Sequence, residues 1–165
     1  MNTALTLGYN CARLVKLMQK SIAQCELDLT GSIVLTEAAR GAYAVTPVLS
    51  AMAGAERVYA VTRTTQYGTV EQITQETEEL AALAGVKGKI KIITGKSEQA
   101  VLEADIITNS GHVRPIDSEM IERFKPTAVI PLMYEAWEFR ASDLDLDFCR
   151  AKGIPVVGTN ERHPA

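Results

Sequence analysis

Short apolar runs alternate with longer amphipathic segments along most of this chain. Runs of this kind are typical of buried strands, because a strand covered on both faces shows no polar alternation. The sequence predicts strands at residues 32–36, 57–62, 89–94, 105–108, 128–132 and 155–158.

The segments between these runs have a helical pattern. Apolar residues recur at spacings of three and four, as at Leu14, Leu17 and Met18, and Gly153 supplies a stop signal. Ser97 is placed to cap a short helix that ends at Glu103. The predicted helices cover residues 10–27, 41–53, 70–84, 97–103, 118–124 and 143–151.

This alternation predicts an α/β protein with a doubly wound, mostly parallel, six-stranded sheet and helices on both faces, that is, a Rossmann-like fold. Six strands that alternate with helices fit the strand order 3-2-1-4-5-6, and a flavodoxin-like order is the alternative. We expect an N-terminal helical segment at residues 1–30 and a Rossmann-like domain at residues 31–165. The amphipathic helix at residues 10–27 has no obvious partner, so we expect it to pack on a second copy of the chain or on a second domain.

The chain ends in a polar and charged stretch, residues 160–165, directly after the last predicted strand. This ending suggests that the sequence is a fragment of a longer two-domain protein. The alternative is a short C-terminal tail, since termini are commonly loose.

Composition narrows the function classes. Apolar residues make up 47% of the chain and charged residues 22%, and the net charge is −3, which argues against a nucleic-acid partner because such proteins usually carry a basic face. No apolar run reaches the roughly 18 residues of a membrane span, and the start lacks a secretory signal pattern, so we expect a cytoplasmic protein. The three cysteines are scattered without a CxxC pair, and we expect neither a disulfide framework nor a metal site.

Residues suited to chemistry gather in the loops that follow the strands. These loops contain both histidines, the only tryptophan and four arginines. In an open α/β sheet, ligands bind at the carboxyl ends of the strands, so we expect the functional site at this edge. The alternative is that loops are polar in any protein.

The first two loops are the candidate cofactor site. After the first strand only Gly41 is present where a glycine-rich dinucleotide turn would stand, and Arg40 and Tyr43 flank it as candidate binding residues. After the second strand, Arg63, Thr64 and Thr65 stand where NAD-selective enzymes place an acid, which favours a 2′-phosphate and makes these three residues candidate cofactor ligands as well. We therefore expect NADP, or else NAD, as the cofactor.

The fourth loop and the later loops are the candidate catalytic and substrate site. His112 can carry a proton near neutral pH, and we assign it as the candidate catalytic residue. Asn109 is assigned to the cofactor. Candidate ligands for a small anionic substrate are Arg114, Glu135, Arg162 and His163. A solvent-exposed loop histidine and ordinary surface charges are the alternatives for these residues.

Two resemblances to known families are carried by longer stretches. Residues 57–63, 97–109 and 125–130 resemble the NAD(P)-binding domain of the ornithine cyclodeaminase and shikimate dehydrogenase group. Residues 143–147 and 150–160 are similar to the last helix and strand of the catalytic domain in D-2-hydroxyacid dehydrogenases. The resemblances imply a Rossmann-type domain that binds NAD(P).

Three functions are compatible with these observations. The first is an NAD(P)-linked oxidoreductase, or one domain of it, that acts on a small anionic metabolite. The second is a non-catalytic Rossmann-like module that binds a nucleotide or another anion. The third is a methyltransferase, which ranks last because such enzymes often carry a glycine-rich first loop and an acid after the second strand.

Overall fold

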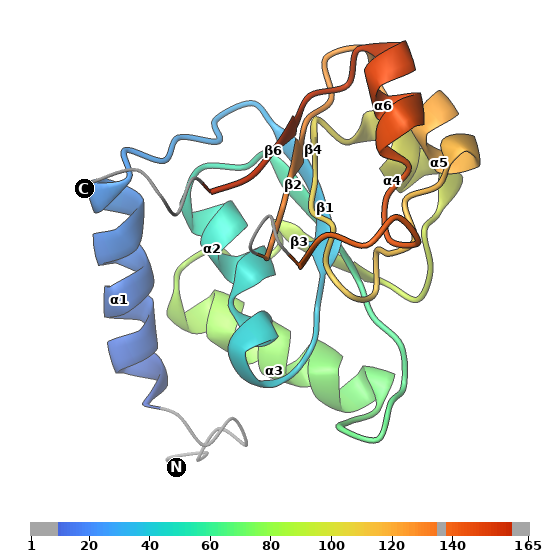
Figure 1. The fold of residues 1–165 in the computed structure, drawn as a ribbon. Coiled ribbons are helices and arrows are strands. Elements are labelled where there is room, and N and C mark those ends of the chain that lie inside the picture. Colours follow the sequence, from blue (N-terminus) through green and yellow to red (C-terminus); the bar gives the residue numbers. More distant parts are fainter. Residues whose placement is uncertain (1–9, 135–137, 160–165) are drawn as a thin grey trace.

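A computed structural model of the chain describes residues 10–134 and 138–159. A parallel sheet separates two groups of helices, with α1, α2 and α3 on one side and α4, α5 and α6 on the other (Figure 1). The helices are α1 (Cys11–Gln24), α2 (Thr46–Met52), α3 (Val70–Leu83), α4 (Glu98–Glu103), α5 (Ser118–Glu122) and α6 (Leu146–Lys152). The strands are β1 (Ile33–Glu37), β2 (Arg57–Val61), β3 (Ile90–Ile93), β4 (Ile106–Ile107), β5 (Ile130–Pro131) and β6 (Val156–Val157).

The sheet has fewer strands than the sequence predicts. Four parallel strands lie in the order β3-β2-β1-β4, and β5 and β6 form a separate two-stranded parallel sheet. One isolated parallel bridge, between Ile106 and Val129, lies between the two sheets. The prediction of one six-stranded sheet is therefore wrong, because β4 and β5 are two residues long each and share too few hydrogen bonds for a continuous ladder.

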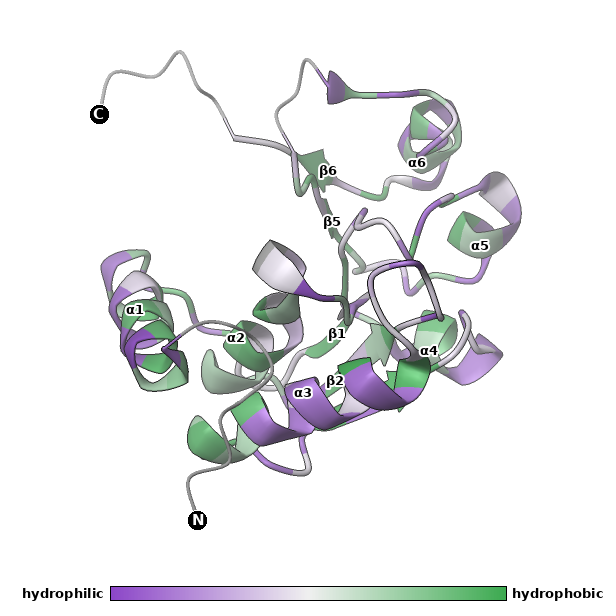
Figure 2. Cartoon of the chain, turned by 90° about the horizontal axis from the view of Figure 1, so that it is seen from below, coloured by the Kyte–Doolittle hydropathy of each residue, from purple (hydrophilic) through white to green (hydrophobic). Residues whose placement is uncertain are grey.

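The two faces of the sheet carry separate apolar cores, as the alternation of side chains along a strand requires. Leu35 and Ile107 point to the side of α4, α5 and α6, where the largest cluster of buried residues lies. Val34 and Val58 point to the opposite side and contact Ala51 of α2. The helices carry both hydrophilic and hydrophobic residues along their length, as Figure 2 shows for α1 and α3.

The helix α1 packs within its own chain. Val15 and Met18 are buried against Val48 of α2 and Leu80 of α3. The sequence-based expectation that this helix packs on a second copy or a second domain is thus wrong for its buried face. Its partner lies elsewhere in the chain, in α2 and α3, and no local pattern reveals such a pairing.

The helix after β1 differs most from its predicted form. The sequence predicts one helix over residues 41–53, but a 3₁₀ turn, η1 (Gly41–Ala44), precedes α2. Pro47 lies in the first turn of α2 and has no N–H to continue a helix from residues before it, so a new helix begins there. The other helix signals are confirmed: the Ser97 hydroxyl accepts a hydrogen bond from the N–H of Ala100, and Gly153 ends α6 with φ +70°.

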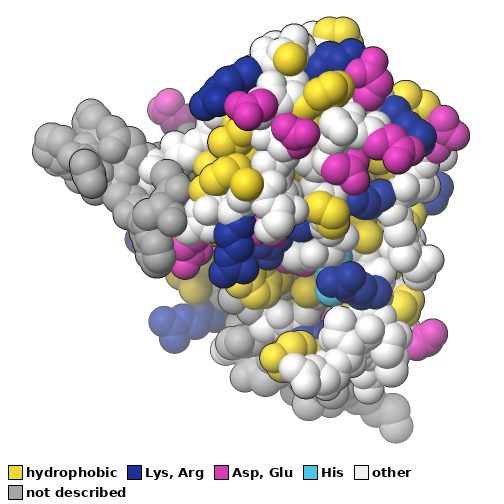
Figure 3. All heavy atoms as spheres, turned by 45° about the vertical axis from the view of Figure 1, so that its right-hand side comes forward, with side chains coloured by type: hydrophobic (Ala, Val, Ile, Leu, Met, Phe, Trp, Pro, Cys, Tyr) yellow, Lys and Arg dark blue, Asp and Glu magenta, His cyan; other side chains and the backbone are white. Residues whose placement is uncertain are grey.

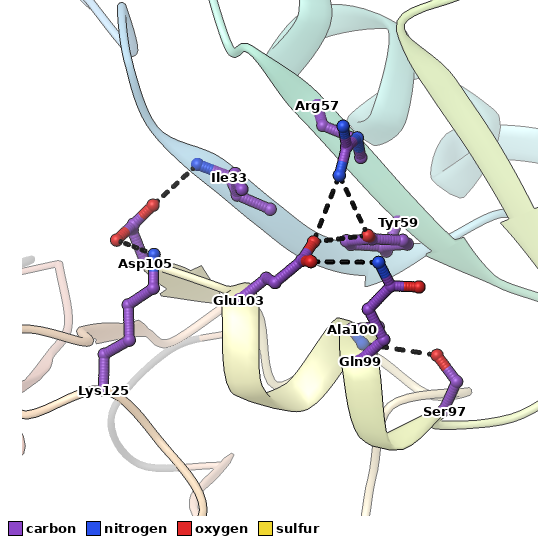
Figure 4. Close-up of polar contacts among 9 residues, drawn as sticks. All are labelled: Ile33, Arg57, Tyr59, Ser97, Gln99, Ala100, Glu103, Asp105 and Lys125. Atoms are coloured by element: carbon purple, nitrogen blue, oxygen red, sulfur yellow. Dashed lines mark hydrogen bonds and ion pairs between the residues drawn. The ribbon is translucent and has the colours of Figure 1, made fainter.

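A polar network links the strands to α4 (Figure 4). The Tyr59 hydroxyl is buried and donates to the Glu103 carboxylate at 2.5 Å, and Arg57 forms an ion pair with the same carboxylate at 3.1 Å. Asp105, before β4, accepts hydrogen bonds from Lys125 and from the N–H of Ile33. These contacts fix the register of β1, β2 and β4 and leave their carboxyl ends free to form loops.

Candidate functional site

A cleft of about 600 Å³ lies at the carboxyl ends of β1 and β2. Three loops form it, the ones that follow β1, β2 and β4, together with one residue of α3. The lining residues are Ala39, Arg40, Gly41, Tyr43, Thr65, Gln66, Tyr67, Ile73 and His112. The structure therefore brings Arg40, Gly41, Tyr43, Thr65 and His112, all candidates from the sequence, to one place.

Apolar and aromatic side chains form much of the cleft wall. Tyr43 is 60% exposed and Tyr67 is 70% exposed, so both rings stand at the rim, while Ile73 is buried behind them. Exposed aromatic rings beside a concave surface are typical of sites for planar ligands. This wall suits a heterocyclic ring such as a nucleotide base.

Arg40 is held by other protein groups. Its guanidinium makes two contacts with the carboxylate of Glu76, at 2.7 and 3.1 Å, and donates to the carbonyl oxygen of Tyr67 at 2.9 Å. The Glu76 side chain is only 5% exposed, so this pair lies partly inside the protein. Arg40 thus supports the cleft wall, with much of its hydrogen-bonding capacity already used.

The loop after β2 presents exposed polar groups without a carboxylate. Arg63 and Thr64 are exposed and lie beside the cleft lining rather than in it. The Thr64 hydroxyl accepts from the N–H of Val70 at 3.4 Å, and the Thr65 hydroxyl accepts from that of Tyr67 at 3.2 Å. Neither hydroxyl donates to another residue in the described part of the chain, so both can donate to a ligand.

The loop after β4 is largely buried. Asn109 is fully buried, and its side-chain oxygen accepts a hydrogen bond from the N–H of Met133 at 2.7 Å. Its amide nitrogen, Nδ2, is buried and has no hydrogen-bonding partner within the described residues. Buried donors without partners are rare and costly in proteins, so this nitrogen is an unusual feature of the loop, although Asn109 does not line the cleft.

His112 lies partly buried in the same cleft. Its ring nitrogen Nδ1 is buried and has no hydrogen-bonding partner in the part of the chain that the structure describes. Burial lowers the pKa of the imidazole, the charge of Glu37 acts to raise it, and the charge of Arg63 lowers it. The net lowered pKa leaves the ring neutral at pH 7, the form that accepts a proton.

Glu37 is a site residue that the sequence reasoning missed. It is the last residue of β1 and only 4% exposed, and its carboxylate accepts a hydrogen bond from the backbone N–H of His112 at 2.9 Å. The sequence does carry a signal for it, an acidic residue at the end of an otherwise apolar strand. Such a position is informative because carboxylates are rarely buried unless they have a partner or a function.

The predicted substrate residues are only partly described. Arg114 does not line the cleft; it forms an ion pair with Asp143 at 2.6 Å and lies 5.7 Å from the centre of the Tyr134 ring. Glu135, Arg162 and His163 lie outside the described residues.

Other kinds of site are not seen in the described part of the chain. Within it, no three histidine, cysteine, aspartate or glutamate side chains are grouped to hold a metal ion, and no helix combines the length and the apolar character of a membrane span. On the face that carries α5 and α6, basic and acidic side chains are interspersed rather than gathered by sign (Figure 3). That face lacks the basic field typical of a nucleic-acid interface.

Comparison with known proteins identifies similar folds only. No family model and no curated protein matches the sequence. Among solved structures, shikimate 5-dehydrogenase from Listeria monocytogenes, in complex with shikimate and NAD, superposes with a TM-score of 0.59 at 11% identity, over 87% of this chain and 51% of that one. Shikimate 5-dehydrogenase from Mycobacterium fortuitum gives 0.54 at 20% identity, over 80% and 46%.

A third similar structure is a dipicolinate synthase chain from Bacillus halodurans, with a TM-score of 0.52 at 14% identity, over 92% of this chain and 47% of that one. The chain thus spans about half the length of these proteins. The similarities confirm a Rossmann-type α/β fold like that of the shikimate dehydrogenase group. The resemblance of residues 143–160 to D-2-hydroxyacid dehydrogenases remains a prediction.

Proposed function

We propose that this chain is the nucleotide-binding domain of an NAD(P)-linked oxidoreductase that acts on a small anionic metabolite, with NADP as the preferred cofactor. The observation that carries the proposal is the cleft where the loops after β1, β2 and β4 meet, lined by Tyr43, Tyr67 and His112. This is the edge at which Rossmann-type domains bind their ligands. The similar shikimate 5-dehydrogenase structure is a complex with NAD and shikimate.

The adenosine half of such a cofactor fits the described residues. Tyr43, Tyr67 and Ile73 offer an apolar wall for the adenine ring. Arg63 and Thr64 stand exposed at the end of β2, and no carboxylate follows that strand to accept from unmodified ribose hydroxyls. A guanidinium beside free hydroxyls matches a ribose 2′-phosphate, which is the group that distinguishes NADP from NAD.

The diphosphate half has fewer matched groups. Gly41 adopts φ +70°, so it serves the turn itself, and nothing lies within 4 Å of the position that its Cβ would occupy. Arg40 adds positive charge, although Glu76 already pairs with it. We therefore expect most of the binding free energy to come from the adenosine side.

Within this proposal His112 is the proton carrier. A bound nicotinamide ring accepts or donates a hydride; the protein must take up or release the accompanying proton. A neutral imidazole in the cleft accepts the proton of a substrate hydroxyl and returns it in the reverse direction. Asn109 and Arg114 lie outside the cleft lining and Arg114 already pairs with Asp143, so they are proposed ligands only for a part of the cofactor or substrate that extends beyond the cleft.

Calorimetric titration with NADP and with NAD tests the cofactor. NADP should bind more tightly, and Arg63→Ala should remove about tenfold of that preference, the value of roughly one charge-assisted contact. Arg123→Ala, an exposed arginine of the α5 end, is the matched control and should leave both affinities unchanged.

Equal affinities for the two dinucleotides would refute the NADP preference. Binding of neither dinucleotide, with retained binding of a mononucleotide or phosphate, would favour the non-catalytic module instead. A His112→Gln variant that binds NADP normally but loses turnover in the full-length protein would support the catalytic assignment.

A further inference from the structure

The buried carboxylate of Glu37 has an unusual environment. The residue is 4% exposed, and within the described chain no Lys or Arg side chain forms an ion pair with it. Its described hydrogen bond comes from a backbone group, the N–H of His112, which lies 75 residues further along the chain. Burying an ionised carboxylate with so little compensation lowers stability, which points to a functional reason for its presence.

The loop before His112 is shaped to approach this carboxylate. A Cβ added to Gly111 would lie 3.3 Å from the Glu37 oxygen Oε2 and 3.7 Å from a guanidinium nitrogen of Arg114. A side chain at this position would crowd the carboxylate. The loop and the end of β1 therefore fit each other closely, and the hydrogen bond orients the backbone of His112 relative to the cleft.

The charged groups around His112 act in opposite directions. Glu37, from β1, favours the protonated imidazole, and Arg63, from the loop after β2, disfavours it. The other nearby arginines are each neutralised by a carboxylate, Arg40 by Glu76 and Arg114 by Asp143. The balance at the imidazole is thus set mainly by burial, by Glu37 and by Arg63.

We propose that Glu37 is the positioning residue of His112: its carboxylate anchors the loop after β4 through the His112 N–H, and its negative charge supports the imidazole when it takes up a proton. This role rests on the proposed function, in which His112 is the proton carrier. Glu37 does not line the cleft, so in this proposal it acts through His112.

Nuclear magnetic resonance of the ligand-free protein tests the electrostatic part. The titration of the His112 ring should move to lower pH in Glu37→Gln, which keeps an oxygen acceptor but removes the charge, and to higher pH in Arg63→Gln. Glu119→Gln, an exposed carboxamide substitution on α5, is the matched control and should not move it. An unchanged His112 titration in Glu37→Gln would overturn the proposal.

Hydrogen exchange of the His112 amide tests the anchoring part. In the unsubstituted protein this amide should exchange slowly, and Glu37→Ala should accelerate its exchange about tenfold or more, the effect of one hydrogen bond to a charged acceptor. If Glu37→Ala does not fold, the unsubstituted protein still decides the point. A His112 amide that exchanges as fast as that of exposed Thr64 would overturn the anchoring role.

These measurements use no cofactor and no turnover, so they separate the two proposals. An unchanged His112 titration in Glu37→Gln, together with a His112→Gln enzyme that loses turnover, would refute the role of Glu37 and leave the catalytic assignment of His112 intact. A clear shift in Glu37→Gln, with a His112→Gln enzyme that turns over normally, would support the positioning geometry and refute the catalytic assignment.

Discussion

Removal of the Arg40 side chain should destabilise the protein substantially. Arg40→Ala deletes two contacts to the Glu76 carboxylate and one to the Tyr67 carbonyl oxygen. It leaves Glu76, 5% exposed, as a buried carboxylate without a cation. Loss of one partner of a buried pair costs about 3 to 5 kcal/mol. Because the Arg40 side chain is 32% exposed and partly screened, we expect a smaller loss, about 2 to 3 kcal/mol.

Urea unfolding followed by circular dichroism measures this loss, and thermal unfolding should show a melting temperature lower by about 5 to 10 °C. The decisive control is a double-mutant cycle with Glu76→Gln. In the Glu76→Gln background no buried charge remains to be stranded, so Arg40→Ala should cost much less, about 1 kcal/mol.

The cycle also separates stability from binding. If Arg40→Ala destabilises the protein equally in both backgrounds, the ion pair contributes nothing and the reasoning from burial fails. If the substitution leaves stability unchanged but weakens phosphate binding, Arg40 is a ligand-binding residue rather than a support of the cleft wall.

Two further predictions concern the network beside β1 and β4. Burial acts to raise the pKa of the Asp105 carboxyl, but hydrogen bonds from Lys125 and from the backbone N–H of Ile33 outweigh it and lower the pKa. The ionised carboxylate therefore stabilises the folded protein at pH values above its ordinary pKa, and this stabilisation is lost as the pH falls through the lowered pKa. The cost of Lys125→Met in urea unfolding should thus be smaller at pH 3 than at pH 7, and equal costs would contradict this. Tyr59→Phe keeps the buried ring but removes the hydrogen bond to Glu103, so it should cost about 1 to 2 kcal/mol in the same assay; a change under about 0.3 kcal/mol would show that the bond contributes little.

The fold could be predicted from the sequence because its main signal is local. Each of the predicted apolar runs contains a strand, and the signals at Ser97 and Gly153 act within one turn of a helix. The lengths of β4, β5 and β6 could not be predicted, since a residue such as Ala128 is equally apolar in a strand and beside one. Pro47 stands inside the helix predicted at residues 41–53, and a proline there is itself a signal for the break that the structure shows.

The site could be predicted only in outline. The rule that ligands bind at the carboxyl ends of the strands predicts the sheet edge where the cleft lies. The structure places Tyr43 and His112, from loops distant in the sequence, in the lining of that cleft. The pairing of Arg40 with Glu76 spans 36 residues, and no pattern marks it. Glu37 escapes sequence reasoning because its role depends on a backbone group 75 residues away, a relationship that only the three-dimensional structure reveals.

The position of β3 at the outside of the four-stranded sheet has a consequence for self-association. Among the described residues, one backbone edge of this strand faces no neighbour in the strand order, and such an edge invites another chain to add a strand. Lys89 and Lys91, before and within the strand, are exposed there. The Lys89 ammonium donates to the carbonyl oxygen of Ala55, and the Lys91 ammonium lies 5.6 Å from the centre of the Tyr59 ring, so a second copy that paired here would have to accommodate two charged side chains beside the new strand. The lysines before and within β3 therefore disfavour edge-to-edge pairing through this strand.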